Sequence, residues 1–289
     1  MYVINKCPVC DNEKNKILYS IEVNEQLEIS KVIDNQINNY SIVFCENCGL
    51  LYRNTRFSND ELSLMYSKEV DDVDYTRYEN RSKHLENYLT SKLNKKIEHM
   101  NILDVGGGKG EITHYFSEKN KCTILEFDIP NYSINENLRL TSDIKSINQP
   151  DIIFFNHIVE HLNEPYSFIH NILNNIHNEC LVYIEVPFEI SHYILLKTVG
   201  HYEHINYFSK QSLENLIKLL GGDIICVETM NGFGNSMLSV AALFRHNPNV
   251  KIKNNNIKAN YLTIKQEAYN IKNLFFILKN KISSRFRNV

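Results

Sequence analysis

The loop sequence 200–209 gathers two histidines, one carboxylate and two tyrosines: His201, His204, Glu203, Tyr202 and Tyr207. An imidazole exchanges a proton near neutral pH, and a neighbouring carboxylate can hold its tautomer and raise its basicity. The loop stands between a predicted strand and a predicted helix, on the side of a parallel sheet that opens to ligands. The pattern therefore indicates proton-transfer chemistry. A hydrogen-bonded structural loop is the alternative, and it is strongest for His201.

A glycine cluster follows a predicted buried strand at residues 102–105. Glycines are needed where a strand turns sharply into a helix and the backbone comes close to a ligand. The spacing is G-x-G-x-G, formed by Gly106, Gly108 and Gly110. The dinucleotide fingerprint would need a glycine at Glu111, and a P-loop would need serine or threonine after Lys109. The sequence therefore disfavours both phosphate-binding motifs.

A nucleoside ligand without a pyrophosphate fits this pattern. Glu126 ends the next predicted strand about twenty residues later, where such folds place the acid that takes the ribose hydroxyls. An ordinary strand–turn–helix is the alternative. The combination resembles motif I and the following acidic position of class I S-adenosylmethionine (SAM) dependent methyltransferases, which implies a Rossmann-like fold and an acid near the adenine at Asp143. The expected cofactor-binding residues are Asp104, Gly106, Gly108, Gly110, Glu126, Asp143, Asn156 and His157.

Two C-x-x-C knuckles near the start of the chain predict a zinc ribbon. They are formed by Cys7, Cys10, Cys45 and Cys48, with strand-like pieces between them. Each knuckle bends two thiolates toward one ion, and four thiolates leave no open position for catalysis, so the zinc should be structural. A redox role is the alternative. The other cysteines stand singly in apolar runs and are expected in the core.

Strand and helix patterns alternate through the middle of the chain. Apolar strands are predicted at 102–105, 122–125, 151–157, 180–186, 224–228 and 237–244. Helices are predicted after Pro165 and after the N-cap Ser209, and two more between Phe57 and Met100. This order predicts an α/β fold with a mostly parallel sheet and one antiparallel edge strand.

The order of five segments resembles the zinc-ribbon-containing sugar methyltransferases: C-x-x-C…C-x-x-C-G, D-V-G-G-G-K-G, H-I-V-E-H-L, E-V-P and Y-E-H-I-N-Y-F-S. The likeness covers roughly residues 1–244, and the best-known members C-methylate nucleotide-linked ketosugars. It implies catalytic roles for Tyr202, Glu203 and His204, with His204 as general base polarised by Glu203. His161 is expected to support the loop, and His157 to lie beside the cofactor.

The resemblance implies a SAM-dependent methyltransferase that acts on a sugar, either nucleotide-linked or part of a surface glycan precursor such as that of a capsular polysaccharide. C-methylating members continue into a further α/β domain, whereas this chain continues into a basic tail. This departure slightly favours O-methylation of a hydroxyl, and C-methylation of a 4-ketosugar stays the alternative. Three residues are candidates for acceptor binding: Tyr75, Tyr78 and His201.

Composition restricts the other function classes. The formal net charge of the chain is −3, and no Asn-Pro-Pro-Tyr or Asp-Pro-Pro-Tyr segment is present, which argues against a nucleic-acid methyltransferase. A scaffold that binds SAM without catalysis is a further alternative. The sequence contains no apolar run long enough for a membrane span and no signal-peptide pattern at its start, so a cytoplasmic location is expected.

The predicted division is a zinc ribbon at 1–57, a helical connector at 58–100, a SAM-binding domain at 101–245 and a basic helical tail at 246–289. Glu267 is the single acid among the basic residues of the tail, which also carries an apolar stripe. Such a helix is expected to dock on its own domain or on a second copy in a homodimer. The alternatives are an anionic membrane, nucleic acid or an anionic polymer.

Overall fold

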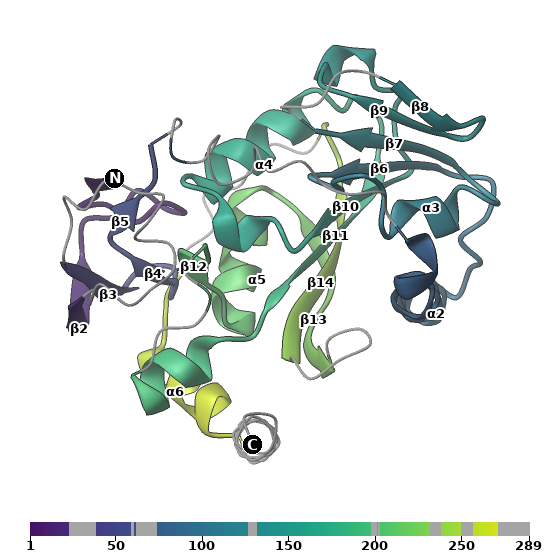
Figure 1. The fold of residues 1–289 in the computed structure, drawn as a ribbon. Coiled ribbons are helices and arrows are strands. Elements are labelled where there is room, and N and C mark those ends of the chain that lie inside the picture. Colours follow the sequence, from purple (N-terminus) through teal and green to yellow (C-terminus); the bar gives the residue numbers. More distant parts are fainter. Residues whose placement is uncertain are drawn as a thin grey trace, which may run out of the picture.

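The computed structural model describes residues 1–22, 39–58, 61, 74–126, 132–197, 201, 203–231, 238–249 and 257–270. An eight-stranded sheet, ordered β13-β14-β11-β10-β6-β7-β9-β8, forms the centre of this part of the chain (Figure 1). Its strands are β6 (Asn101–Val105), β7 (Lys121–Leu125), β8 (Tyr132–Asn135), β9 (Leu138–Thr141), β10 (Ile152–Asn156), β11 (Cys180–Pro187), β13 (Asp223–Asn231) and β14 (Leu238–His246). The neighbouring strands β11, β10, β6, β7 and β9 pair in parallel, as the alternating pattern predicts.

The antiparallel strands differ from the sequence-based prediction. β14 pairs antiparallel with both β11 and β13, so it lies inside the sheet and not at its edge. The physical reason is burial, because residues 240–244 are fully buried and need neighbours on both sides, whereas β13 is half-exposed. At the opposite edge, β8 pairs antiparallel with β9, which the sequence did not predict.

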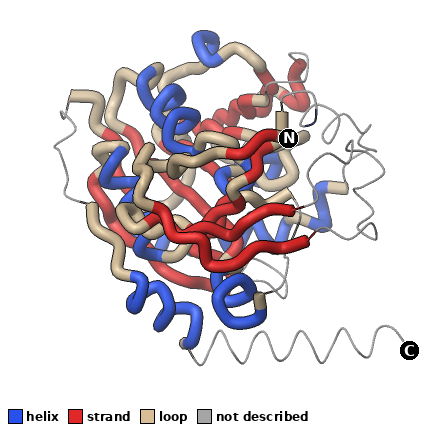
Figure 2. Tube along the Cα trace, turned by 90° about the vertical axis from the view of Figure 1, so that its left-hand side faces the viewer, coloured by secondary structure: helices blue, strands red, loops and turns tan. Residues whose placement is uncertain are grey.

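Helices cover both faces of the sheet. The helices α2 (Glu79–Leu93) and α3 (Thr113–Phe116) pack on one face, and α4 (Pro165–Asn174) and α5 (Lys210–Leu219) pack on the other (Figure 1). Figure 2 shows the helices and strands of the chain in a view turned by 90°. Neighbouring positions of each strand point to opposite faces. Ile102 and Phe154 pack with α2 and α3, whereas Leu103 and Phe155 join the cluster of α4 and α5. Each buried side chain of this size contributes about 1.5–3 kcal/mol.

The helix boundaries follow local chemistry. Pro165 occupies the first turn of α4, where the missing N–H costs nothing. Ser209 caps α5 and forms a reciprocal capping box with Ser212, which confirms the predicted N-cap. In the predicted connector, α2 is present after the short helix η2 (Tyr75–Arg77). The other connector helix falls on 62–73, outside the described residues.

A second sheet of four strands lies beside the central sheet, with the order β12-β4-β3-β2 (Figure 1). Its strands are β2 (Asn15–Glu22), β3 (Asn39–Cys45), β4 (Leu51–Arg53) and β12 (Asn206–Tyr207), and the short pair β1 (Tyr2–Val3) and β5 (Thr55–Arg56) adjoins them. β12 comes from the histidine-containing loop about 150 residues away from its partner β4, as the pair Asn206–Tyr52 shows. The N-terminal sheet is therefore completed by the loop that carries the proton-transfer candidates.

The described part of the basic tail docks on the rest of the chain. Its helix α6 (Tyr261–Tyr269) buries Ile264 and Ala268 completely. The Ser191 hydroxyl donates to the carbonyl of Ala268 at 3.1 Å, and the Lys210 amide donates to the Glu267 carboxylate at 3.1 Å. Residues 271–289, the rest of the predicted tail helix, are outside the described residues. Within the described ranges, the structure has no helix with the length and apolarity needed to cross a bilayer.

Candidate active site

The glycine turn after β6 has the geometry of a close approach. Gly106 has φ +68°, and a Cβ there would stand 2.1 Å from Cδ1 of Ile158. Gly108 has φ +56°, and its amide donates to Oε2 of Glu126 at 3.2 Å. L side chains rarely adopt this backbone conformation, so glycine is required at both positions. The turn thus brings together the glycines and the acid that the sequence assigns to one ligand.

Asp104 is buried beneath this turn, with 2% of its surface exposed. One carboxylate oxygen accepts a hydrogen bond from the Thr113 hydroxyl, and the other has no hydrogen-bond partner among the described residues. Burial raises the pKa of Asp104 from 3.8 to about 7, although the Thr113 hydrogen bond opposes the shift. A carboxyl group with this pKa is partly protonated at neutral pH.

Asp104→Asn should therefore change the pH dependence of stability. The raised pKa means that the folded state binds the Asp104 proton more tightly, so the wild type loses stability as pH rises from about 4 to 7. The asparagine variant lacks this loss. We expect its free energy of unfolding, relative to wild type, to improve by on the order of 2 kcal/mol between pH 5 and 8 in urea titrations. An identical difference at both pH values would contradict the raised pKa.

The other cofactor and acceptor candidates lie in different surroundings. Tyr75 donates its hydroxyl to the carbonyl of Lys109 at 3.0 Å, so this acceptor candidate lies at the glycine turn. Tyr78 packs at the start of α2, partly buried against the core. Asp143 is exposed after β9, and its carboxylate accepts from the Lys145 amide at 2.9 Å.

Asn156 and His157 stand at the end of β10. The Asn156 side-chain oxygen accepts a hydrogen bond from Arg81 at 3.0 Å. His157 has φ +55°, and its Nε2 lies 3.2 Å from the Glu185 carboxylate, with Nδ1 3.4 Å from Glu160. Burial alone would lower the pKa of His157, but these two carboxylates outweigh it and raise the pKa to about 9. The sequence did not predict the contacts of Arg81 with Asn156 and of Glu185 with His157, because the residues of each pair are distant along the chain.

His204 is buried, and its Nδ1 lies 2.8 Å from Oε2 of Glu189. Burial lowers the pKa of His204, but the Glu189 carboxylate reverses this and raises it. Glu189, not Glu203, is therefore the carboxylate that orients the imidazole, which corrects the prediction from sequence. Glu203 acts on His204 only through its charge, while its backbone carbonyl lies 3.2 Å from Nδ1 of His161.

The other candidate residues of the histidine-containing loop lie in different surroundings from His204 and Glu189. His201 is exposed, with its ring centre 4.9 Å from that of His204. Tyr202 lies outside the described residues. His161 supports the loop as predicted, because its ring also packs edge-on against His204 at 4.7 Å. Glu189 follows β11 by two residues, and no spacing pattern in the sequence links it to His204.

If His204 is the general base that the sequence predicts, Glu189→Gln should lower kcat by about tenfold or more, because the uncharged amide no longer stabilises the imidazolium that proton transfer would create. The affinity for the nucleoside ligand expected at the glycine turn should not change, since Glu189 contacts His204 and not this turn. Glu203→Gln is the comparison variant, with an expected loss of about threefold or less because its charge acts at a distance. Steady-state kinetics of both variants measure the two losses of kcat. A larger loss in Glu203→Gln than in Glu189→Gln would support Glu203 as the carboxylate that orients His204.

The N-terminal sheet holds the histidine-containing loop through backbone bonds. The Arg53 amide donates to the carbonyl of Ile205 at 3.0 Å. The fully buried Arg56 guanidinium donates to the carbonyls of Arg53 and Ile205 and to the side-chain oxygen of Asn206, at 2.8, 3.2 and 3.0 Å. On the other side, the Asn206 amide donates to the carbonyl of Leu162 at 2.7 Å. Ile205 and Asn206, the two residues after His204, are thus held between the N-terminal sheet and the 157–164 segment.

The four knuckle cysteines converge on one point. The Sγ atoms of Cys7 and Cys48 are 3.5 Å apart, as are those of Cys10 and Cys45, and all four lie within 4.8 Å of one another. A tetrahedral ion with Zn–S bonds of about 2.3 Å needs sulfur atoms about 3.8 Å apart. The donor set and its spacing therefore fit zinc, and all four thiols are free of disulfides.

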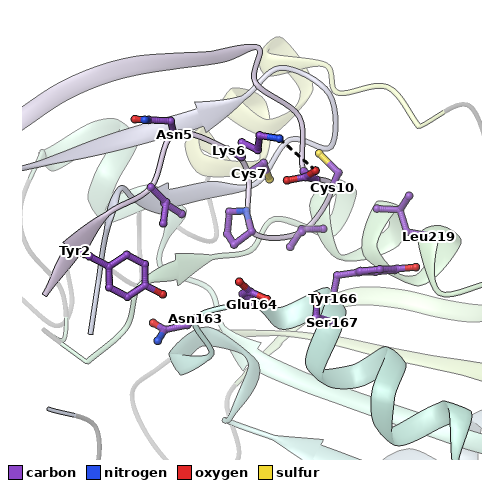
Figure 3. Close-up of a pocket in the computed structure, with 14 residues that line it drawn as sticks. Tyr2, Asn5, Lys6, Cys7, Cys10, Asn163, Glu164, Tyr166, Ser167 and Leu219 are labelled. Atoms are coloured by element: carbon purple, nitrogen blue, oxygen red, sulfur yellow. Dashed lines mark ion pairs between the residues drawn. The ribbon is translucent and has the colours of Figure 1, made fainter. Parts of the chain in front are cut away.

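A surface pocket of about 560 Å³ lies between the first knuckle and α4 (Figure 3). Lys6 and Cys10 line one side, and Asn163, Glu164 and Tyr166 line the other. The pocket includes neither the glycine turn nor His204. It is therefore separate from the site that the chemistry-bearing residues form.

Residues 76–227 match the family model described as a methyltransferase domain. This stretch is more than half of the 289-residue chain, so the chain belongs to that family. Its fold is the class I Rossmann-like methyltransferase fold with a mostly parallel central sheet. The protein is an enzyme, a SAM-dependent methyltransferase.

Several solved methyltransferase structures are similar to the chain. One is the 1,6-didemethyltoxoflavin-N1-methyltransferase of Burkholderia thailandensis, with 15% identity, coverage of 74% of this chain and 96% of that one, and a TM-score of 0.48. Another is the magnesium protoporphyrin IX methyltransferase of Synechocystis, with 10% identity, coverage of 66% and 95%, and a TM-score of 0.43. A plantazolicin methyltransferase has 16% identity, coverage of 66% and 91%, and a TM-score of 0.43. No curated protein matches the chain significantly.

Proposed function

We propose that this enzyme transfers the methyl group of SAM to a hydroxyl of a sugar, with His204 as the general base. The observation that carries this proposal is the buried pair of His204 and Glu189, with 2.8 Å between Nδ1 and Oε2. The pair belongs to the same cluster of elements as the cofactor turn, because Gly106 approaches Ile158 and the 157–161 segment continues to His161, which packs on His204. A base and a methyl donor held by neighbouring segments can act on one acceptor.

The glycine turn is the proposed place of the cofactor. The turn from Gly106 to Gly110 would face the amino-acid part of SAM, with Glu126 on the ribose and Asp143 near the adenine. Asp104, Asn156 and His157 would border the same ligand. SAM supplies an activated methyl group when it is bound. The chain contributes positioning and exclusion of water, which account for much of the rate of such reactions.

His204 would accept the proton in the transfer step. Glu189 bonds Nδ1, so the proton of the neutral imidazole resides there and Nε2 can receive another. The acceptor oxygen forms a bond to the methyl carbon as the carbon–sulfur bond breaks, and the hydroxyl proton passes to Nε2. The imidazolium that results is stabilised by the Glu189 carboxylate, which is the established logic of a base oriented by a buried acid.

We also propose that Cys7, Cys10, Cys45 and Cys48 hold one structural zinc ion. The support is the convergence of the four sulfur atoms within 4.8 Å of one another. With four thiolate ligands the ion has no open position, so its role is to stabilise the N-terminal sheet. Because β12 belongs to that sheet, the zinc would act on catalysis by holding the loop of His204 in place.

The sugar class rests on the resemblance carried by the knuckles and by the segment 202–209. A nucleotide-linked sugar and a glycan precursor both fit, and a cytoplasmic reaction on such a precursor is part of the proposal. C-methylation of a 4-ketosugar differs from O-methylation in its chemistry, since it passes through an enolate that exchanges a carbon-bound hydrogen with solvent.

Mass spectrometry in heavy water distinguishes these reactions. The enzyme and SAM would be incubated with nucleotide-linked 4-ketosugars and with sugars that offer only hydroxyls. We expect a gain of one methyl group on a hydroxyl-only sugar, without deuterium on carbon. Methylation of a ketosugar with deuterium entering next to the carbonyl would overturn O-methylation. Methylation of RNA or DNA with no product from any sugar would overturn the sugar class.

A further inference from the structure

Glu160 is a buried acid for which the methyl-transfer proposal has no use. It follows β10 in the short helix η4 (Val159–His161), and 1% of its surface is exposed. Neither of its carboxylate oxygens has a hydrogen-bond partner among the described residues. Its nearest partner is the His157 imidazole, whose Nδ1 lies 3.4 Å from Oε1, and this ring also faces the Glu185 carboxylate at 3.2 Å. One imidazole shared between two buried acids leaves room for a further cation at Glu160.

Besides His157, two more imidazoles, those of His161 and His204, lie close to this carboxylate. Nε2 of His161 lies 3.7 Å from Oε1 of Glu160. One ligand atom each of Glu160, His161 and His204 lies within 4.8 Å of the other two. Donor atoms about 2.1 Å from one ion are separated by roughly 3 to 4 Å, so small side-chain movements would bring all three onto a common ion. This cluster is separate from the four cysteines.

The tautomers of both histidines are set by the partners of their Nδ1 atoms. Nδ1 of His161 lies 3.2 Å from the backbone carbonyl of Glu203, which can only accept, so Nδ1 carries the proton. Nδ1 of His204 is bonded to the Glu189 carboxylate. In each neutral ring the lone pair is then on Nε2. Metal-binding histidines are oriented in this way by a carbonyl or carboxylate on the other nitrogen.

We propose that Glu160, His161 and His204 form a second metal site, for a divalent cation of the manganese-to-zinc series. Two imidazoles and one carboxylate are ligands that suit these ions, and three protein ligands leave further positions for water or an acceptor oxygen. The bound ion would add to the His157 imidazole, 3.4 Å away, in compensating the charge of the buried Glu160 carboxylate.

The ion would compete with proton transfer. It would take the lone pair of His204 Nε2, the atom that receives the acceptor proton, so the rate should fall as the site fills. This consequence rests on the proposed function, whereas the site itself does not. Binding is therefore measured without turnover, by titrating Co²⁺ into full-length protein that already carries zinc in its cysteine cluster.

We expect one additional Co²⁺ to give visible ligand-field bands without thiolate-to-cobalt charge-transfer absorption. Glu160→Gln and His161→Gln should each weaken this binding by about tenfold or more. Glu164→Gln, an exposed acid four residues along, is the matched control and should bind as the wild type does. Retention of the cysteine-bound zinc in each variant shows that it is folded.

The proposal of a second metal site is contradicted if the zinc-loaded wild type gives no ligand-field bands with Co²⁺ or only charge-transfer bands. It is also contradicted if Glu160→Gln and His161→Gln both bind Co²⁺ as tightly as the wild type. A rate that falls in parallel with Co²⁺ occupancy supports both the site and its competition with the base. A rate that rises with occupancy keeps the site but contradicts His204 as general base, so the two proposals fail separately.

Discussion

His204→Ala should lower kcat by about 10²- to 10⁴-fold, the usual contribution of a positioned general base. The side chain is buried, and its Nδ1 holds the Glu189 carboxylate at 2.8 Å. Alanine removes both the proton acceptor and the partner of a buried acid. Single-turnover measurements with saturating SAM would report the chemical step directly, and SAM affinity should stay within about twofold because the cofactor turn is untouched.

Two further variants test whether the His204 imidazole itself is required for the reaction. His204→Gln keeps much of the volume and offers Glu189 a hydrogen-bond donor, so it should stay folded and yet be as slow as the alanine variant. His177→Ala changes an exposed histidine after α4 and should keep the wild-type rate. Full turnover in folded His204→Gln would remove His204 from the mechanism.

Cys45→Ser should remove zinc and most of the activity together. Cys45 ends β3, and β3 pairs with β4, which in turn pairs with β12 of the histidine-containing loop. Loss of a structural zinc site costs a large part of the folding free energy of its unit. A displacement of His204 by about 1 Å would cost on the order of 10²-fold in rate. We therefore expect no zinc, a lower thermal midpoint and a kcat reduced by at least that factor.

Cys226→Ser is the matched control for this experiment. Cys226 lies in β13, and its sulfur is 3.4 Å from the Tyr88 hydroxyl, away from the four converging cysteines. Its zinc content should equal that of the wild type. Metal analysis with thermal unfolding would contradict the account if Cys45→Ser kept its zinc, or if it lost zinc without any change in midpoint or rate.

Local patterns predicted much of the fold. Apolar runs placed the six main strands, the proline at 165 and the serine at 209 marked the starts of α4 and α5, and the cysteine spacing predicted the convergence of four thiols. Each of these features depends on neighbours in the chain or on one residue type with one dominant geometry. The position of β14 inside the sheet was missed, although the apolar run at residues 240–244 was the available signal.

The residues that contact the candidate site residues could not be predicted from the sequence. Glu203 is adjacent to His204 and was the natural choice from sequence. The two residues lie in a turn in which the His204 amide donates to the carbonyl of His201, and the 2.8 Å contact to the imidazole comes from Glu189. Arg56 contacts Asn206 from 150 positions away. Such contacts depend on how the N-terminal sheet meets the loop, and no periodicity along the chain encodes that arrangement. The division into four units stays a prediction, as does a homodimer.

In the proposed mechanism, the turn from Gly106 to Gly110 holds SAM together with Glu126 while His204 acts on the acceptor. Isothermal titration of S-adenosylhomocysteine into the wild type, Glu126→Gln and His204→Gln tests it most directly. We predict Kd at least about tenfold higher for Glu126→Gln, since hydrogen bonds to a charged group are worth about 1.5–3 kcal/mol, and an unchanged Kd for His204→Gln. Equal affinity in all three proteins, or weakening only in His204→Gln, would contradict this division of roles.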